Sequence, residues 1–510
     1  MAKQSIGVSL PVFDRLDTDP VLSLYRQIYE RIRGTILSGS LAPGTRLPSS
    51  RTLAVDLRVS RNTVELAFTQ LEAEGFLVRK VGAGTYVASA IPELERAPRR
   101  LGITAVRPAA PSGREPLSLR GRHTVGAASR AEVWVRATSR ALAPRVVEVP
   151  NRRLFARGLP NLDAFPLATW RRLLARHARL WERESLFHGN AAGYRPLREA
   201  LVGYLATARG VRCDWRQIII LSGTQQVLDL AARLLLDPGD AAWLEEPGYL
   251  GAWGALQSAG ARIISVPVDP DGMNVDTGIR LAPTARLAYV TPSHQYPVGV
   301  TLSLGRRLAL LEWAARAQAW VIEDDYDSEF RYTGRPLAAL QALDVGGRVI
   351  YAGTFNKLLF PALRLAYAVV PERLVDGFAA ARTLVDGFAP SFMQAVLTEF
   401  ITAGHLSSHV RRMRALYHER RDLLLDVMAR RLGGRIEVKS ADTGMHVAGW
   451  LRPGSDDREI SRRAFDKGLD LPPLSRYYHT RRPRPGLFFN YAGISPGDIR
   501  RGIDTLATLL

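Results

Sequence analysis

Residues 351–364 read Y-A-G-T-F-N-K-L-L-F-P-A-L-R, and this stretch decides the fold of the second part of the chain. Lys357 follows a strand-like run, residues 348–352, and small polar residues surround it. A lysine in this setting can form an internal aldimine with pyridoxal phosphate. An acidic cluster, E-D-D-Y-D, occupies residues 323–327, and Asp324 precedes Lys357 by 33 residues. That interval holds one strand, a connection and the next strand, so we expect both side chains at the carboxyl ends of neighbouring strands.

The composition indicates several domains and a polyanionic partner. A chain of 510 residues is too long for one ordinary core, and its net charge of +20 favours nucleic acid as a partner. No run of about eighteen apolar residues occurs, and the start M-A-K-Q-S-I-G lacks the layout of a secretory signal, so a cytoplasmic protein without a membrane span is expected. The single cysteine, Cys213, excludes an internal disulfide or a cysteine-rich metal site, and no metal is expected.

The first 88 residues predict three helices and a hairpin. An apolar stripe repeats every fourth residue and ends at Gly39; it comprises Leu24, Ile28, Ile32 and Ile36. A short helix is expected from Arg51 to about Leu57, with Ser49 or Ser50 as its cap. Ser60 caps a third helix, whose inner face holds Val64, Ala67, Phe68 and Leu71. The runs F-L-V-R-K and T-Y-V-A flank V-G-A-G, so residues 1–88 read as a winged helix-turn-helix.

Residues 89–150 predict a linker, because the sequence is rich in Ala, Pro and Arg and has few large apolar side chains. It would act as a solvated tether or would touch DNA phosphates. From residue 151 onward, seven runs rich in Val, Ile and Leu alternate with helix-length segments. They predict a mostly parallel sheet covered on both faces in a large part, about 151–370, followed by a smaller α+β part, about 371–510.

Several polar residues at predicted strand ends would contact the cofactor. The turn L-S-G-T-Q-Q would direct the amides of Gly223, Thr224 and Gln225 at a phosphate, although many strand-to-helix turns look alike. Thr354, Asn356 and Arg364 are close enough to Lys357 in sequence to bind the same phosphate.

The ring of the cofactor has its own candidates. Asp324 would keep a pyridinium nitrogen protonated, and Tyr326, on the same side of an extended segment, would donate to the ring oxygen, whereas Asp325 would point away. Acidic residues at strand ends also occur in solvated loops and at helix caps. Tyr249 would stack on the ring or lie in the core, and His294 would touch the ring or satisfy a loop.

Helix geometry names the DNA contacts. The third helix begins S-R-N-T-V, which places Arg61, Asn62 and Thr63 at the end that enters the major groove. Arg51 at the start of the second helix, with Ser50 beside it and Arg46 before it, would reach phosphates. Lys80, Gly82 and Gly84 at the hairpin would enter the adjacent minor groove. Each arginine taken alone would more often be a solvated surface residue.

With these motifs in place, the chain closely resembles the MocR subfamily of the GntR bacterial transcription regulators. The resemblance is carried by L-P-S-S-R-T-L-A, V-S-R-N-T-V, G-Y-R-P-L-R-E-A-L, L-S-G-T-Q-Q, E-E-P-G-Y, T-P-S-H-Q-Y-P-V-G, E-D-D-Y-D-S-E-F and T-F-N-K, and it covers nearly the whole chain except the linker. It implies a winged helix joined to a domain like the fold type I aminotransferases. It also implies the following roles: Lys357 as the aldimine lysine, Asp324 as the pyridine partner, Tyr326 as the ring-oxygen donor, Tyr249 as the stacking aromatic and Arg364 as a phosphate ligand.

The resemblance further implies a head-to-tail homodimer that binds a double-stranded DNA operator. Members of the subfamily sense pyridoxal phosphate itself or an amino compound that reacts with it. Two positions depart from the pattern. Asn356 stands where serine is common, and the late arginine that grips an effector carboxylate in relatives is matched only by Arg484, which prolines flank.

The sequence thus predicts a pyridoxal-phosphate-binding transcription regulator. Two alternatives stay open. One is a catalytically active aminotransferase with a DNA-binding appendage, since the same parts serve sensing and catalysis. The other is a DNA-binding protein whose second domain has lost the cofactor and only dimerises.

Overall fold

The computed structural model describes residues 24–37, 39–80, 84–88, 153–182, 187–333, 337–438, 442–480 and 484–510. The predicted linker, 89–150, lies outside these residues. The chain separates into two compact units, which are described in turn. Within the described ranges, no helix is both long enough and apolar enough to cross a membrane.

The N-terminal unit is a winged helix, as predicted. Its elements are α1 (Leu24–Leu37), α2 (Ser50–Asp56), α3 (Arg61–Ala73), β1 (Leu77–Lys80) and β2 (Gly84–Val87), and β1 pairs antiparallel with β2. Ile28, Ile32 and Ile36 from α1 are buried against Phe68 and Leu71 of α3. Leu24, which the helical stripe placed inside, is 44% exposed, because it is the first residue of α1 and lies at the edge of this core.

Serine side chains cap the N-terminal ends of α2 and α3. The Ser49 hydroxyl accepts a hydrogen bond from the Thr52 amide, and the Ser60 hydroxyl accepts one from the Thr63 amide, each at 3.1 Å. Both bonds satisfy amides that have no partner within the helix, which fixes where each helix starts. The tight turn between α2 and α3 passes through Arg58, whose φ of 52° lies in the left-handed region.

The second unit is built on an eight-stranded sheet with the order β3-β10-β9-β8-β7-β4-β5-β6. The seven predicted apolar runs form β3 (Ile218–Leu221), β4 (Ala241–Glu246), β5 (Arg262–Asp269), β7 (Leu287–Val290), β8 (Trp320–Asp325), β9 (Val349–Thr354) and β10 (Ala366–Val369). Strands β5, β4, β7, β8 and β9 run parallel, whereas β10 is antiparallel to both of its neighbours. The short edge strand β6 (Gly272–Met273) was not predicted.

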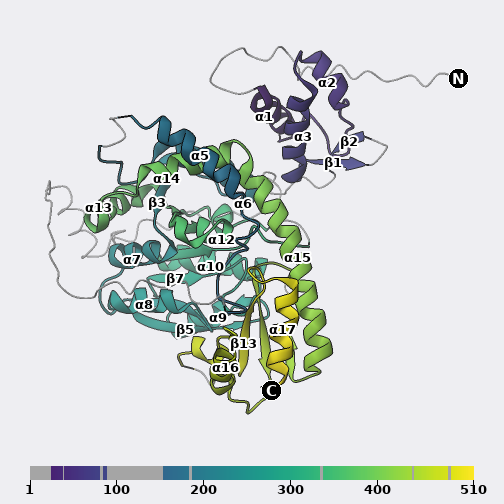
Figure 1. Ribbon diagram of the computed structural model, residues 1–510. Helices are drawn as coiled ribbons and strands as arrows, with labels where there is room; N and C mark the ends of the chain where they lie inside the picture. The colour runs from purple at the N-terminus through teal and green to yellow at the C-terminus, as the bar shows by residue number, and fades with distance from the viewer. Residues whose placement is uncertain are drawn as a thin grey trace. The chain divides into compact units, whose positions relative to one another are not determined.

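Helices cover both faces of this sheet, which explains why its strands are apolar throughout. Alternate strand residues, such as Leu244 and Ile322, pack under α7 (Thr224–Leu235), α8 (Leu250–Ser258) and α13 (Val375–Asp386). The residues between them, such as Trp243 and Val321, pack under α9 (Val275–Leu281) and α10 (Leu304–Ala317). Figure 1 shows the sheet within the teal part of the chain, with helices labelled around it.

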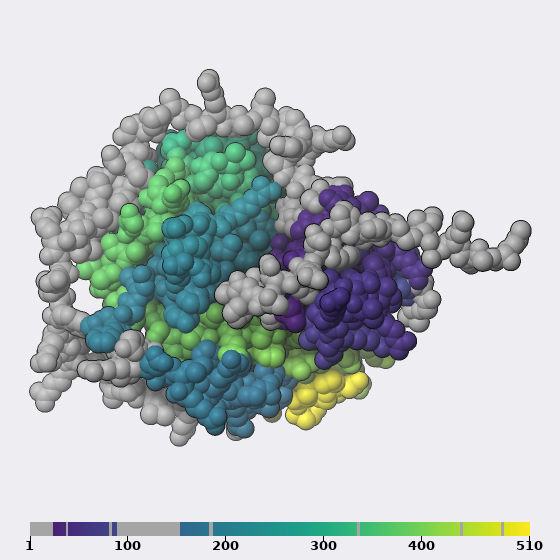
Figure 2. Space-filling model, turned by 90° about the horizontal axis from the view of Figure 1, so that it is seen from above, coloured from purple at the N-terminus to yellow at the C-terminus, as the bar shows by residue number. Residues whose placement is uncertain are grey.

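Three further helices lie together beside the sheet: α5 (Leu167–Arg179), α6 (Arg195–Arg209) and α14 (Ser391–Thr402). Helix α14 packs against both α5 and α6, and Figure 1 labels α5 and α14 side by side. In Figure 2 the blue spheres of the part of the chain that holds α5 and α6 lie next to green spheres from later in the chain. Aromatic rings fill the space between α5 and α14, with Trp170 and Phe400 edge to face at 5.3 Å.

The C-terminal part carries a three-stranded antiparallel sheet of β11 (Ile436–Val438), β12 (His446–Leu451) and β13 (Gly486–Asn490). Its helices are α15 (His405–Leu432), α16 (Asp457–Asp466) and α17 (Pro496–Ala507). The remaining short elements are α11 (Leu340–Leu343), α12 (Phe355–Leu358), η3 (Trp215–Gln217), η4 (Pro361–Leu363), η5 (Glu372–Leu374) and η6 (Leu474–Tyr477). The predicted fold class, a winged helix followed by an α/β domain and a smaller α+β part, is therefore present.

Candidate cofactor pocket and DNA-binding surface

Lys357 lies on α12, directly after strand β9. The Thr354 side chain caps this short helix by accepting a hydrogen bond from the Asn356 amide at 3.2 Å. The Lys357 amine donates to the carbonyl oxygen of Gly158 at 3.0 Å. Burial lowers the pKa of Lys357, while the charges of Asp327 and Asp324 act in the opposite direction. A lowered pKa increases the fraction of neutral amine, which is the nucleophilic form.

Asp324 lies on β8, the strand next to β9, as the spacing predicted. One carboxylate oxygen accepts a hydrogen bond from the Tyr289 hydroxyl at 2.8 Å, and the other, Oδ1, is buried without a partner among the described residues. Burial raises the pKa of Asp324 to about 7, although the Tyr289 hydrogen bond opposes that shift. A buried carboxylate oxygen without a hydrogen bond lowers the stability of the folded protein. A ligand that donates a hydrogen bond to Asp324 Oδ1 would remove this cost.

Asp325 points to the other side of the strand, as predicted. Its carboxylate accepts hydrogen bonds from the Arg209 guanidinium and the Tyr351 hydroxyl, both at 2.6 Å. Arg209 also donates to the Ser293 hydroxyl at 2.6 Å, so one buried guanidinium joins β8 to the loop that carries His294. Both contacts go to Oδ2 of Asp325, and its Oδ1, like that of Asp324, is buried without a partner among the described residues. The two aspartates differ in their neighbours: Asp325 is paired with a buried guanidinium, whereas Asp324 contacts Tyr289 and feels the charge of Lys357.

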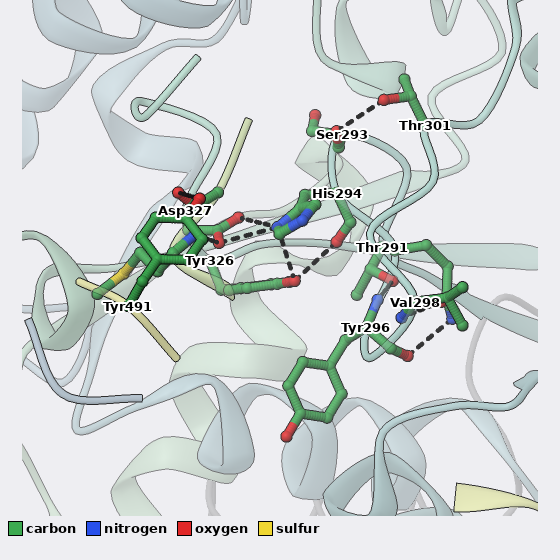
Figure 3. A network of polar contacts seen from close by, with 12 residues as sticks. Thr291, Ser293, His294, Tyr296, Val298, Thr301, Tyr326, Asp327 and Tyr491 are labelled. Atoms are coloured by element: carbon green, nitrogen blue, oxygen red, sulfur yellow. Dashed lines mark hydrogen bonds and ion pairs between the residues drawn. The ribbon is translucent and has the colours of Figure 1, made fainter. Parts of the chain in front are cut away.

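His294, Tyr326 and Asp327 form a polar network, drawn in Figure 3. The Tyr326 hydroxyl donates to the His294 carbonyl oxygen at 2.8 Å, and His294 Nδ1 lies 2.9 Å from the Asp327 carboxylate. The His446 ring lies 4.5 Å from the His294 ring, and burial first, then the nearby His294, lowers the pKa of His446 well below its usual range. One ligand atom from each of His294, Asp327 and His446 lies within 4.8 Å of the others, a grouping that the sequence did not predict.

The predicted phosphate ligands lie in two groups. Gly223 caps α7, and a Cβ atom at Gly223 would lie 3.3 Å from an Arg364 guanidinium nitrogen, so the glycine turn and Arg364 are adjacent. Thr224 begins α7, and its neighbour Gln225 donates to the Gly251 carbonyl oxygen at 2.9 Å. On α12, the Asn356 side-chain oxygen is buried without a partner among the described residues.

Tyr249 lies at the start of α8, after strand β4. Its ring is 6.4 Å from that of Tyr289, the residue that holds Asp324, and 5.8 Å from that of Tyr296. Burial raises the pKa of Tyr249, and the charge of Asp324 adds to the shift. Tyr249 therefore lies close to Asp324, and we predicted from the sequence that this tyrosine stacks on the cofactor ring.

The structure does not bring Arg484 into this pocket. Its guanidinium forms an ion pair with Glu437 and lies over the Trp450 ring, with 47% of the side chain exposed. Arg484 precedes β13 by two residues and faces the neighbouring strand β11, where Glu437 supplies a nearer carboxylate. The expectation that Arg484 binds an effector is not supported by its position.

Sequence reasoning missed four residues of this pocket: Gly158, Tyr289, Asp327 and His446. Asp327 ends the acidic cluster at residues 323–327, and Tyr289 lies on β7, which is one of the seven predicted apolar runs. Gly158 is 199 residues from Lys357 and His446 is on the small sheet, and neither position carries a local signal.

In the winged helix, Arg61 and Asn62 are exposed at the start of α3, and Thr63 shares a hydrogen bond with the capping hydroxyl of Ser60. Arg51 is exposed at the start of α2. Ser50, which is predicted to contact DNA, donates to the Glu65 carboxylate at 2.5 Å in the protein alone.

Arg46 and Lys80 both lie on the wing. The Arg46 guanidinium lies against Gly84, where a Cβ atom would be 3.1 Å away. The Lys80 amine lies 5.2 Å from the Tyr86 ring. Gly82 lies outside the described residues.

Comparisons with known proteins agree with both units. Residues 24–87 match the family of bacterial regulatory proteins, gntR family, and residues 161–506 match aminotransferase class I and II. The chain is 40% identical to a probable rhizopine catabolism regulatory protein, MocR, of Rhizobium meliloti, over 96% of this chain and 94% of that protein. It is 29% identical to the pyridoxine biosynthesis transcriptional regulator PdxR of Corynebacterium glutamicum, over 94% of each.

Among solved structures, a kynurenine aminotransferase of Pyrococcus horikoshii is similar to the second unit, with 31% identity and a TM-score of 0.66, over 71% of this chain and 91% of that one. Fold and site together define a class: a transcription regulator in which a gntR-type DNA-binding domain is fused to an aminotransferase-like domain. Within that class, the chain belongs to the MocR subfamily of the GntR family.

Proposed function

We propose that this regulator binds pyridoxal phosphate covalently through Lys357 and that the occupancy of this pocket changes how the winged helix binds its operator. The sensed ligand is pyridoxal phosphate itself or an amino compound that reacts with it. The observation that carries the proposal is the pairing of a partly buried amine with a buried carboxylate, Asp324, that has one oxygen without a partner among the described residues.

The side chains present fit this cofactor. The unpartnered oxygen of Asp324 suits a protonated pyridine nitrogen, and the aromatic face of Tyr249 suits the ring. Arg364 and the amides at the start of α7 suit the phosphate, and Thr354 and Asn356 at α12 are further candidates to bind it. When bound, pyridoxal phosphate supplies an aldehyde that reacts with amines and a ring that withdraws electrons.

Two residues prepare the pocket for the reaction. The Gly158 carbonyl oxygen accepts a hydrogen bond from the Lys357 amine, and burial lowers the pKa of this amine, which increases the fraction of its neutral form. We propose that Tyr326 donates a hydrogen bond to the ring oxygen of the cofactor. In the structure, its hydroxyl donates to the His294 carbonyl oxygen and lies beside the His294–Asp327 pair. The hydroxyl would therefore exchange one acceptor for another when the ligand enters.

The regulatory step is a shift between two arrangements of a homodimer, which we propose to be head to tail and to act in the cytoplasm. A ligand that binds one arrangement more tightly shifts the population toward it, typically by about 1–3 kcal/mol. Operator affinity then follows the population, provided that the two winged helices match the spacing of the half-sites in one arrangement only.

Covalent binding is tested by soaking the purified protein in pyridoxal phosphate, reducing it with borohydride and mapping the adduct by mass spectrometry. We expect a visible absorbance band in the wild type before reduction, an adduct on Lys357 after reduction, and neither in Lys357→Ala. Lys467→Ala, which removes an exposed lysine at the end of α16, is the matched control and should behave like the wild type. An adduct mapped only to another lysine would refute the proposal.

Sensing is tested by gel shift and footprinting with and without pyridoxal phosphate. We expect the cofactor to change the affinity or the footprint of the wild type but not of Lys357→Ala. Identical affinity and footprint for the wild type in both conditions would remove the sensing role and leave cofactor binding intact.

A second candidate is transamination, which the match to aminotransferase class I and II and the complete set of Lys357, Asp324 and Tyr326 favour. An assay with amino donors and keto acids separates the two functions. Turnover at ordinary enzyme rates would establish an enzyme, and a reaction that stops after the amine has bound would establish a sensor.

A further inference from the structure

The face of α3 that points away from the core carries one large apolar side chain. Val64, Ala67, Phe68 and Leu71 are buried on the inner face. Asn62, Leu66 and Thr69, spaced four and three residues apart, form a row on the opposite face. Leu66 occupies the middle of this row and is 55% exposed.

Glu65, the charged residue next to Leu66, is held away from the outer face by its hydrogen-bond and ion-pair partners. The Glu65 carboxylate accepts a hydrogen bond from the Ser50 hydroxyl at 2.5 Å and pairs with the Arg79 guanidinium at 3.0 Å. Arg79 also donates to the Thr69 hydroxyl at 3.2 Å. These contacts hold Glu65 toward α2 and the wing, and they leave Leu66 and Asn62 as the side chains at the centre of the outer face.

The chemistry of the major groove specifies what this leucine can recognise. Base edges there present hydrogen-bond donors and acceptors, and the C5 methyl group of thymine is the apolar feature. A cytosine at the same position lacks that methyl group. Charge also favours DNA as the partner of this helix, because Arg61 is exposed at the first position of α3 and Arg51 is exposed near the start of α2.

We propose that Leu66 reads the methyl group of a thymine in the major groove and so helps to set the operator sequence. This inference rests on the operator binding of the proposed function and names a residue that specifies sequence. Arg61 and Asn62 would supply polar contacts at the start of the helix, and Leu66 would supply the apolar contact one turn further along.

The test begins with a duplex that the full-length protein selects from a random library at fixed salt. Each thymine is then replaced by deoxyuridine, which removes only the methyl group. We expect one thymine in each half-site at which the wild type loses about fourfold in affinity per methyl group. The protein Leu66→Ala should bind the deoxyuridine and thymine duplexes equally at that position, and the double-mutant cycle isolates this coupling.

Leu281→Ala is the matched control, because Leu281 is also a leucine with 55% exposure but lies at the end of α9. It should show the same loss of affinity for the deoxyuridine duplex as the wild type.

An unchanged affinity of the wild type for every deoxyuridine duplex would overturn the inference, and so would a wild-type loss of affinity in Leu66→Ala. If Leu66→Ala alters only the sedimentation of the dimer, the residue serves a protein contact and the inference is wrong. Failure to select any sequence would instead refute operator binding itself.

Discussion

Gly158 determines how closely the backbone approaches the amine of Lys357. Its φ of +63° lies in the left-handed region, and a Cβ atom there would lie 2.0 Å from the Lys357 nitrogen. We predict that Gly158→Ala displaces the amine and slows the covalent attachment of pyridoxal phosphate at least tenfold. Because a lysine end is flexible, the displacement should affect attachment more than folding. The rate of appearance of the visible absorbance band measures it.

Gly347→Ala separates the displacement of the amine from backbone strain. Gly347 has a similar φ of +60°, and a Cβ atom there would have no neighbour within 4 Å. Both variants carry the strain of a left-handed alanine, and only Gly158→Ala crowds the lysine. Equal attachment rates in the two variants would show that proximity to the amine has no role.

The buried carboxylates give the cofactor-free protein a pH dependence. Burial raises the pKa of Glu245 to about 7, above its value in an unfolded chain, so the folded state holds a proton that the unfolded state releases. Stability therefore falls as the pH rises from about 4 to about 7, by at most about 1.4 kcal/mol per pH unit for this group. We predict that Glu245→Gln removes this part of the slope.

Urea unfolding of the cofactor-free protein at several pH values between 5 and 8 measures the slope. Tryptophan fluorescence does not report on the winged helix, because none of the nine tryptophans lies in residues 24–88; Trp134 is in the predicted linker, and the other eight lie at residue 170 or later. Glu312→Gln, which changes an exposed carboxylate on α10, should keep the wild-type slope. Parallel curves for the wild type and Glu245→Gln would contradict the assignment.

At the scale of elements, the cap of α3 stabilises the helix that is proposed to enter the groove. The Ser60 hydroxyl accepts a hydrogen bond from the Thr63 amide at 3.1 Å. The loss of such a cap lowers the stability of a helix by about 1 kcal/mol. We predict that Ser60→Ala makes the amides of α3 exchange with deuterium about fivefold faster, as measured by mass spectrometry. Ser303→Ala, which removes the cap of α10, should leave the exchange of α3 unchanged. Unchanged exchange in Ser60→Ala would show that the cap contributes nothing.

Most elements could be predicted because their signals are local. Val, Ile and Leu mark the buried strands β3, β4 and β8, and the serine caps mark α2 and α3. The direction of β10 could not be predicted, because antiparallel pairing with β3 and β9 depends on how the chain returns to the sheet. Strand β6 has only two residues and no periodicity to detect.

The candidate site divides in the same way. Asp324 and Lys357 could be placed on neighbouring strands, because one spacing and the rule for parallel sheets are sufficient. The contact of Lys357 with Gly158 could not, because it joins residues that are 199 positions apart. Arg484 was expected near the pocket from its place before β13, but the partner that holds it, Glu437, lies on a strand 47 residues earlier. The domain boundaries and the proposed DNA contacts stay predictions.

For the whole molecule, the charge of +20 implies a strong dependence of DNA binding on salt. Each phosphate contact contributes about 0.9 to the slope of log affinity against log salt concentration. We predict that Arg51→Gln lowers the slope by about that amount and leaves the order of preferred sequences unchanged. Fluorescence anisotropy at several salt concentrations measures it.

Arg171→Gln provides the control at this scale. It removes the same charge from α5, a helix of the aminotransferase-like domain on which Arg171 is exposed, and the slope should stay at the wild-type value. Equal slopes for Arg51→Gln and Arg171→Gln would show that Arg51 does not contact a phosphate. A changed sequence preference in Arg51→Gln would show that it contacts bases instead.

The lone thiol of Cys213 has a practical consequence for such experiments. Burial first, then the charge of Asp214, raises the pKa of Cys213 to about 12. At neutral pH only about one thiol in a hundred thousand is then ionised, and maleimides react with the ionised form. A cysteine introduced on the outer surface of the winged helix would therefore take up a fluorophore almost alone, and the native sequence needs no prior replacement for single-molecule recordings.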